Sequence, residues 1–87
     1  MALSSKIRFT KHAREKFDFI KHYGFEIDKK EVFATIQNPT RLEQKNGQYF
    51  ATKAIDMKYA LRVVYEKRKD YLLVITFYPV RRERYGV

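Results

Sequence analysis

Hydrophobic residues recur at helical spacing in the first part of the chain and at alternating spacing in the rest. Ala13, Phe17 and Ile20 stand at positions i, i+4 and i+7, which places them on one face of a helix. Thr10 precedes this stripe and suits an N-cap, because its hydroxyl can accept a hydrogen bond from the first turn. The pattern predicts a helix over residues 11–23.

A capping box marks the start of a second helix. Asp28 offers an N-cap carboxylate, and Glu31 three residues later completes the box. The dipeptide Asn38-Pro39 stops this helix, because a residue before proline disfavours the helical region of backbone space. We therefore expect the second helix over residues 29–37.

The remaining segments are rich in β-branched and aromatic residues, which is typical of strands. Asn46-Gly47 is a strong signal for a two-residue hairpin turn. Pro79 is expected to end the last strand, because proline cannot donate to a ladder. The expected strands cover residues 6–9, 40–44, 48–55, 59–66 and 71–78.

This order predicts an α+β fold over residues 1–87, as a single domain. Two N-terminal helices should pack on one face of an antiparallel sheet of four to five strands. The strand over residues 71–78 is the most apolar, so we expect it to be central.

The charge balance points to a polyanionic partner. The chain has 19 Lys and Arg against 10 Asp and Glu, a formal net charge of +9, which attracts phosphates. Cysteine is absent, which excludes disulfides, thiolate chemistry and cysteine metal sites. The start of the chain has no signal-peptide pattern, and no run approaches the roughly 20 apolar residues that span a bilayer. We expect a cytoplasmic protein that has no contact with a membrane and needs no cofactor.

Arg62 lies in the middle of an expected strand, between two apolar neighbours. With a polar hairpin tip at residues 67–70, it would pair opposite Ile75. Two interpretations stay open for its side chain. It can form an ion pair with a carboxylate on the same face, such as Glu66, or its planar fork can bind a phosphate on an open sheet face.

The last residues combine positive charge with an aromatic ring. Arg81, Arg82, Arg84 and Tyr85 follow directly after the last expected strand. Such a segment is either a solvated basic tail or an RNA clamp, in which arginines bind phosphates and the ring stacks on a base. Lys53 likewise is either a solvated edge lysine or a phosphate contact on the open face.

His12 is expected in the first turn of the first helix. The helix dipole there disfavours a protonated imidazole, which leaves the ring available as a general base. A packing or capping histidine is the alternative. His22 lies ten residues further on, and no carboxylates complete a ligand set with the two histidines, so we expect no metal site.

Several catalytic patterns are absent from the sequence. There is no glycine-rich phosphate loop, no nucleophile elbow and no spacing typical of paired catalytic carboxylates. The acidic residues are scattered, whereas metal-dependent nucleases gather them around divalent ions. A nuclease of this sequence should therefore be metal-independent.

Four short motifs resemble a known group of proteins. They are the start Ile7-Arg8-Phe9-Thr10-Lys11-His12-Ala13-Arg14, the helix end Ile36-Gln37-Asn38-Pro39, the run Leu61-Arg62-Val63-Val64-Tyr65-Glu66, and Val74-Ile75-Thr76-Phe77-Tyr78-Pro79 with its Tyr-Pro-x-Arg-Arg end. The chain is similar in these motifs to a family of small bacterial and archaeal proteins grouped with the RelE/ParE and BrnT toxins. The order of elements predicted above is also the RelE-like order.

The resemblance implies a function and a site. RelE-like toxins cut mRNA without a metal, using the 2′-hydroxyl of the RNA as nucleophile and leaving a cyclic phosphate. Their site lies on the open sheet face, where Lys53 would match a strand lysine and Arg62 a strand arginine. Arg82 would match the arginine after the last strand, and Tyr85 the terminal tyrosine. His12 matches the Lys-His-Ala start of the family.

The leading hypothesis is a metal-independent endoribonuclease toxin of a toxin–antitoxin pair. Its expected partners are RNA, free or on the ribosome, and a small antitoxin that is acidic or binds DNA. Two alternatives stay open, namely a non-catalytic RNA- or ribosome-binding module and a protein-binding toxin of the gyrase-inhibitor type seen in ParE-like relatives. The expected catalytic residues are His12, Arg62, Arg82 and Tyr85, and the expected RNA contacts are Lys53, Arg14, Arg81 and Arg84.

Overall fold

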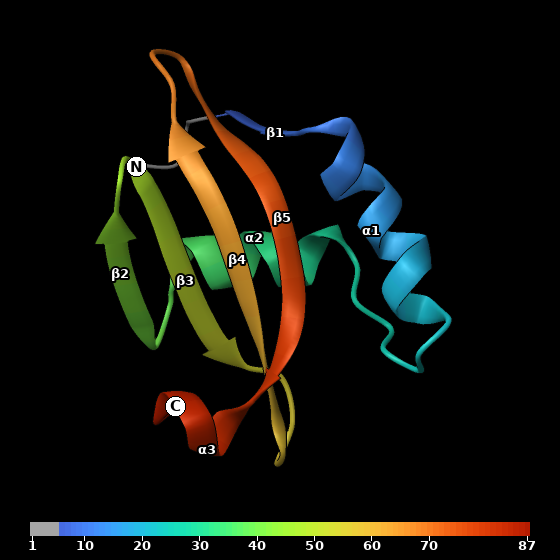
Figure 1. Ribbon diagram of the computed structural model, residues 1–87. Coiled ribbons are helices and arrows are strands. Elements are labelled where there is room, and N and C mark those ends of the chain that lie inside the picture. Colours follow the sequence, from blue (N-terminus) through green and yellow to red (C-terminus); the bar gives the residue numbers. More distant parts are fainter. Residues whose placement is uncertain (1–5) are drawn as a thin grey trace.

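The computed structural model describes residues 6–87 as three helices and one five-stranded sheet (Figure 1). This confirms the predicted α+β class, with two helices ahead of the strand meander. No helix among residues 6–87 is long and apolar enough to cross a membrane. In chain order the elements are β1 (Lys6–Phe9), α1 (Lys11–Lys21), α2 (Lys29–Gln37), β2 (Arg41–Lys45), β3 (Gln48–Ala54), β4 (Tyr59–Lys67), β5 (Tyr71–Arg81) and α3 (Arg82–Tyr85).

The predicted helix starts are confirmed by their caps. Thr10 Oγ1 accepts a hydrogen bond of 3.0 Å from the backbone N–H of Ala13, and Asp28 Oδ1 accepts one of 3.1 Å from that of Glu31. Each bond satisfies a donor that the first helical turn leaves without a partner. α1 ends at Lys21, two residues before the predicted end, and α2 has the predicted bounds.

The sheet order is β1-β5-β4-β3-β2, so β4 is the central strand and β5 lies between β4 and β1. The expectation that the strand over residues 71–78 is central was wrong. β2 to β5 pair antiparallel as predicted, whereas β1 pairs with β5 in the parallel direction, so the sheet is mixed. The side chains of Ile7 and Phe9 pack against the core from this edge position, which explains why β1 joins β5.

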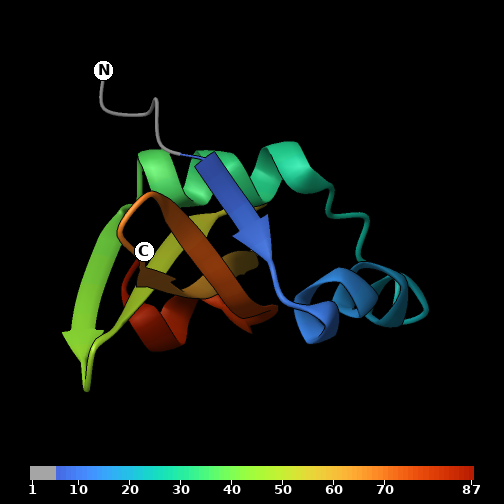
Figure 2. The same cartoon turned by 90° about the horizontal axis from the view of Figure 1, so that it is seen from above.

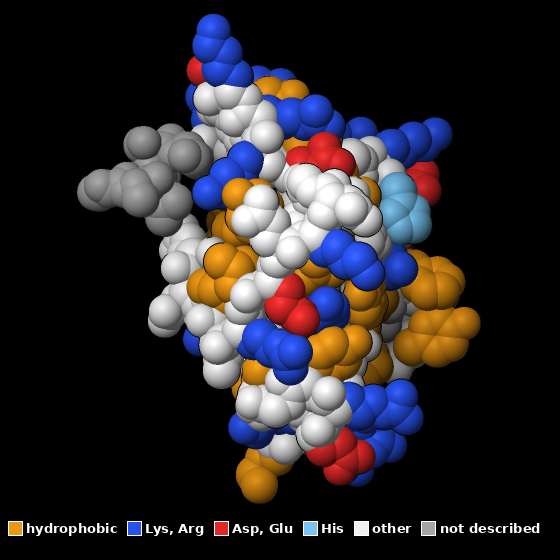
Figure 3. Space-filling model, turned by 60° about the vertical axis from the view of Figure 1, so that its left-hand side comes forward, with side chains coloured by type: hydrophobic (Ala, Val, Ile, Leu, Met, Phe, Trp, Pro, Cys, Tyr) orange, Lys and Arg blue, Asp and Glu red, His pale blue; other side chains and the backbone are white. Residues whose placement is uncertain are grey.

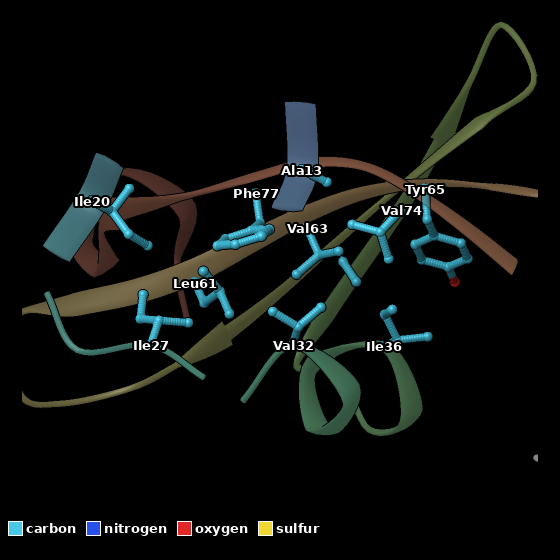
Figure 4. Packing of buried hydrophobic residues seen from close by; sticks show 11 residues of the cluster. Ala13, Ile20, Ile27, Val32, Ile36, Leu61, Val63, Tyr65, Val74 and Phe77 are labelled. Atoms are coloured by element: carbon cyan, nitrogen blue, oxygen red, sulfur yellow. The ribbon is translucent and has the colours of Figure 1, made fainter. Parts of the chain in front are cut away.

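The core fills the space between the two long helices and one face of the sheet. Val32 from α2 and Phe77 from β5 are fully buried there, as are Leu61 and Val63 from β4 (Figure 4). Ala13 and Ile20 contribute from α1. Seen from above, α2 covers one side of the sheet and α3 lies on the other side (Figure 2). The helical layer therefore leaves the second sheet face for α3 and for solvent.

β5 extends to Arg81, although Pro79 was expected to end it. Pro79 lies opposite Leu61 in the ladder with β4. β1 pairs with β5 only as far as Val74, so β5 has a free edge beyond that residue. Proline is tolerated at a free edge because no neighbouring strand there needs its missing N–H group.

The register of β4 and β5 differs from the prediction. Arg62 lies opposite Tyr78 and not opposite Ile75. Lys67 pairs with Leu72, so the hairpin tip lies later in the sequence than was expected. A bulge at Ile75, which has no partner on β4, shifts the register by one further residue. The pairing of Arg62 with an aromatic neighbour on β5 follows from both changes.

Candidate functional site

The sheet face opposite α2 is lined by polar and aromatic side chains. Leu61 and Val63 point into the core, so the period of two in a strand sends the Arg62 side chain to the other face. A space-filling view shows basic, acidic and hydrophobic side chains intermixed over the β2–β4 side of the molecule (Figure 3). We call this surface the open face. The residues paired with Arg62 across the sheet, and every second residue along the same strands, share its face. They are Arg41, Glu43, Phe50, Thr52, Arg62, Val64, Thr76 and Tyr78.

The guanidinium of Arg62 is the centre of the open face. Its carbon lies 5.0 Å from the ring centroid of Phe50 and 4.6 Å from that of Tyr85, so two aromatic rings contact the cation. Its Nη1 donates a hydrogen bond of 3.0 Å to Thr52 Oγ1. Only 11% of the side chain remains exposed. Strand β3, strand β4 and helix α3 thus meet at one arginine.

Glu43 on β2 neutralises part of this charge. Its Oε1 lies 2.9 Å from Arg62 Nη1, and its Oε2 accepts a hydrogen bond of 3.2 Å from Arg41 Nη2. Oε1 is shielded from solvent, and the Arg62 guanidinium is its ion-pair partner. Two guanidiniums and one carboxylate leave one net positive charge in this cluster.

The prediction that Glu66 is the ion-pair partner of Arg62 was wrong. Glu66 instead forms an ion pair with Arg68 and accepts a hydrogen bond of 3.2 Å from Gln48 Nε2. The ion-pair interpretation of Arg62 therefore holds, but its carboxylate comes from Glu43, which is 19 positions away in the sequence. Arg62 also lies on the sheet face without the long helices, as expected, and phosphate binding by its side chain stays a prediction.

The local field shifts the pKa values of both partners. The hydrogen bond and charge of Arg62 hold the pKa of the Glu43 carboxyl below its ordinary value, against a smaller opposing effect of desolvation. Desolvation lowers the pKa of Arg62, but its interactions with Glu43 and Tyr78 together outweigh this effect and the pKa is raised. Both groups are therefore charged throughout the neutral range.

Helix α3, which the sequence did not predict, places Tyr85 on the open face. Arg41 Nη1 donates a hydrogen bond of 2.7 Å to the Tyr85 carbonyl. Arg82 anchors the other side of α3, because its Nε donates to the Val87 carbonyl at 2.9 Å and its Nη1 to the Asp56 carbonyl at 3.0 Å. The structure thus gives Arg82 contacts with backbone carbonyls and gives Tyr85 a contact with Arg62.

His12 lies at the rim of the open face. Its Nε2 is 3.2 Å from Thr76 Oγ1, and the two atoms share a hydrogen bond. Thr76 and Tyr78 point to the same face of β5, roughly 7 Å apart along the strand, and Arg62 lies opposite Tyr78. The fold therefore brings the imidazole of α1 to the same surface as the arginine of β4.

The structure places the other expected RNA contacts at different distances from this group. Lys53 lies opposite Leu61, so its side chain belongs to the face that carries the core, and the expectation that it reaches the open face was wrong. Arg81 lies 3.8 Å from Glu83 and over the Tyr59 ring at 5.7 Å. Arg84 is exposed on α3 and lines a hollow together with Arg81 and Tyr85.

Arg14 belongs to a second basic surface at the β1 edge. Its Nη1 donates a hydrogen bond of 3.2 Å to the Phe9 carbonyl. Arg8 and Lys29 line the same shallow hollow, which has no acidic residue among its lining side chains. This hollow is separate from the Arg62 cluster, because no residue of that cluster lines it.

No group of three or more metal-ligating side chains occurs within residues 6–87. No protein-family model, no curated protein and no solved structure matches the chain. The fold and the site define a small basic α+β protein, with an arginine–glutamate–arginine cluster and a histidine on its open sheet face.

The Glu43 carboxylate should stabilise the fold in a pH-dependent way. A lowered pKa means that its contribution is present above the ordinary carboxyl pKa and is lost as the pH falls through the folded value. We expect Glu43→Gln to lower the free energy of unfolding at pH 7 and to have a much smaller effect near pH 3, measured by urea denaturation. Glu83→Gln is the matched control and should show no such difference, because Glu83 is 78% exposed. Equal effects of Glu43→Gln at both pH values would contradict the ion-pair assignment.

Arg82→Ala should detach α3 while leaving the rest of the sheet folded. The substitution removes the guanidinium that bridges the Val87 and Asp56 carbonyls. We expect faster amide hydrogen exchange in residues 82–87, measured by mass spectrometry, with little change in α2. Arg84→Ala removes a similar charge from the exposed side of α3 and should leave exchange unchanged. Slow exchange in Arg82→Ala would show that α3 does not depend on this anchor.

Proposed function

We propose that the protein is a metal-independent endoribonuclease of the toxin type, acting on RNA bound to the open face. The observation that carries this proposal is the placement of His12 on Thr76, beside the strand residues that face Arg62. An imidazole and a guanidinium on one surface suit cleavage by an RNA 2′-hydroxyl, because the imidazole can move a proton and the guanidinium can stabilise negative charge. The net charge of +9 and the resemblance to RelE-like toxins support an RNA substrate.

The proposed reaction needs two proton transfers and one site for negative charge. The 2′-oxygen bonds to phosphorus and the bond from phosphorus to the 5′-oxygen breaks, which leaves a 2′,3′-cyclic phosphate and a 5′-hydroxyl. His12 moves a proton, either from the 2′-hydroxyl or to the leaving 5′-oxygen, and a second group or water completes the exchange. Arg62 stabilises the phosphorane, whose negative charge develops during the reaction. Tyr85 orients the RNA by stacking on a base.

The position that an RNA phosphate would take beside Arg62 is partly occupied by the Glu43 carboxylate. In the free protein Glu43 lies on Arg62, so an RNA phosphate must compete with it or bind beside it. In the free protein, the Glu43 carboxylate can hold the guanidinium in the orientation in which it would bind a phosphate. Arg82 is left out of the proposed chemistry, because its Nε and Nη1 atoms donate to backbone carbonyls.

A non-catalytic RNA-binding module is the second candidate. The pairing of Arg62 with Glu43 favours it, because the most buried cation of the face is already partly neutralised. RNA would then bind mainly through exposed arginines, such as Arg81 and Arg84, and would stay intact. Binding of that kind falls steeply as salt rises, roughly by one power of concentration for each phosphate contacted.

The test combines mapping of RNA ends in cells with cleavage by the purified protein. Induced expression should create new 5′-hydroxyl ends, and the purified protein should cut single-stranded RNA in excess EDTA. Replacing the 2′-hydroxyl at the cut position by hydrogen should abolish cleavage, because it removes the nucleophile. His12→Ala and Arg62→Ala should each slow cleavage by about 100-fold or more. His22→Ala, at the other end of α1, is the matched control and should cut normally.

Three results would contradict the proposal. Cleavage that EDTA abolishes would require a metal. Undiminished cleavage by His12→Ala and Arg62→Ala would move the chemistry elsewhere. Intact RNA that still binds the protein would favour the binding module, whereas growth arrest accompanied by DNA damage and whole mRNA would favour a gyrase-inhibitor type.

A further inference from the structure

Helix α1 and the turn that follows it carry an exposed aromatic pair that the core does not use. Phe19 and Tyr23 are 54% and 70% exposed, although Ala13 and Ile20 on the same helix are buried. The two ring centroids are 5.3 Å apart, and the ring planes are inclined at 54°. Each ring therefore still presents a broad face to solvent.

This pair continues a stripe that begins at His12. His12, Lys16 and Phe19 follow one another at intervals of four and three residues, which is one face of α1. Tyr23 lies four residues further on, in the turn after the helix. His12, Lys16 and Phe19, together with Glu15, line a shallow hollow of about 250 Å³. The aromatic pair is thus continuous with the histidine that contacts Thr76 on the open face.

A cation lies beside one ring of the pair. Lys16 Nζ lies 5.5 Å from the centroid of the Phe19 ring. The sequence of α1 has four basic residues against two acidic ones, and Lys21 lies in its last turn. Figure 3 shows hydrophobic side chains that project beside a histidine at the margin of the view. Exposed rings next to cations, on a chain of net charge +9, suit a ligand that has both flat faces and negative charge.

We propose that Phe19 and Tyr23 form a stacking platform for two unpaired bases of single-stranded RNA, with Lys16 contacting the intervening phosphate. The platform extends the RNA site beyond His12, and it rests on the RNA binding in the proposed function. A duplex would not use it, because paired bases have no free faces to stack on aromatic side chains. The hydrophobic surface of a protein partner is the competing occupant, and the charge around the rings favours RNA over it.

The test separates aromatic stacking from hydrophobic contact. One double variant, Phe19→Leu with Tyr23→Leu, keeps apolar side chains but removes both ring faces. The other, Phe19→Tyr with Tyr23→Phe, keeps both rings and exchanges their hydroxyl group. Leu42→Ala with Met57→Ala is the control, because these are the other two large exposed hydrophobic residues within residues 6–87. The probe is a short single-stranded RNA with 2′-O-methyl groups, which cannot supply a nucleophile, labelled with fluorescein or with 2-aminopurine.

The leucine variant should bind this RNA about 5-fold or more weakly by fluorescence anisotropy, given the usual contribution of one stacked base. It should also lose the quenching of 2-aminopurine that stacking produces. The ring-exchange variant and the control should bind within about twofold of the wild type, because stacking needs the ring face alone. Duplex RNA should bind the wild type and the leucine variant equally.

Equal binding of single-stranded RNA by the leucine variant and the wild type would overturn the platform. If His12→Ala and Arg62→Ala still abolish cleavage in that case, the proposed function stands and only the platform fails. If the wild-type protein raises no anisotropy with any RNA, both proposals fail. Pull-down of a protein partner that tolerates leucine at both positions, without loss of RNA affinity, would assign the rings to a protein contact instead.

Discussion

The alternation of β4 imposes the main constraint on this molecule. Leu61 and Val63 must enter the core, so the side chain between them must lie on the other face of the central strand. That side chain is Arg62, whose charge cannot stay partly buried without partners. Glu43 supplies the opposite charge, while Phe50 and Tyr85 supply ring faces. The burial of Leu61 and Val63 thus fixes the position of Arg62, and Glu43 of β2 and Tyr85 of α3 pack around it.

The same constraint shapes the proposed chemistry. Helices α1 and α2 cover the core face, so any ligand reaches β4 from the side of Arg62 and Tyr85. α1 also places His12 on this side, because the hydroxyl of its N-cap residue Thr10 donates a hydrogen bond to the Ile75 carbonyl of β5. A helix that mainly serves the core therefore also borders the open face with an imidazole and, further along, with exposed rings.

Signals within a few residues predicted the helices and strands, whereas contacts between residues far apart in the sequence could not be predicted. Caps at Thr10 and Asp28 are decided within one helical turn, so their chemistry is readable from adjacent residues. The carboxylate of Glu43 was missed because it reaches Arg62 across β3, and the turn between β3 and β4 has no residue pattern that fixes its register. The parallel pairing of β1 was missed for the same reason, since nothing near Lys6–Phe9 specifies a strand 65 residues later.

The most direct measurement is a nuclear magnetic resonance titration of the protein with non-cleavable single-stranded RNA. The predicted result is a set of shifts in the His12 ring, the Arg62 side chain and the amides of Thr76, Tyr78 and Tyr85, with α2 unchanged. Shifts confined to the exposed side of α2, or to the basic hollow of Arg8, Arg14 and Lys29, would contradict an RNA site on the open face.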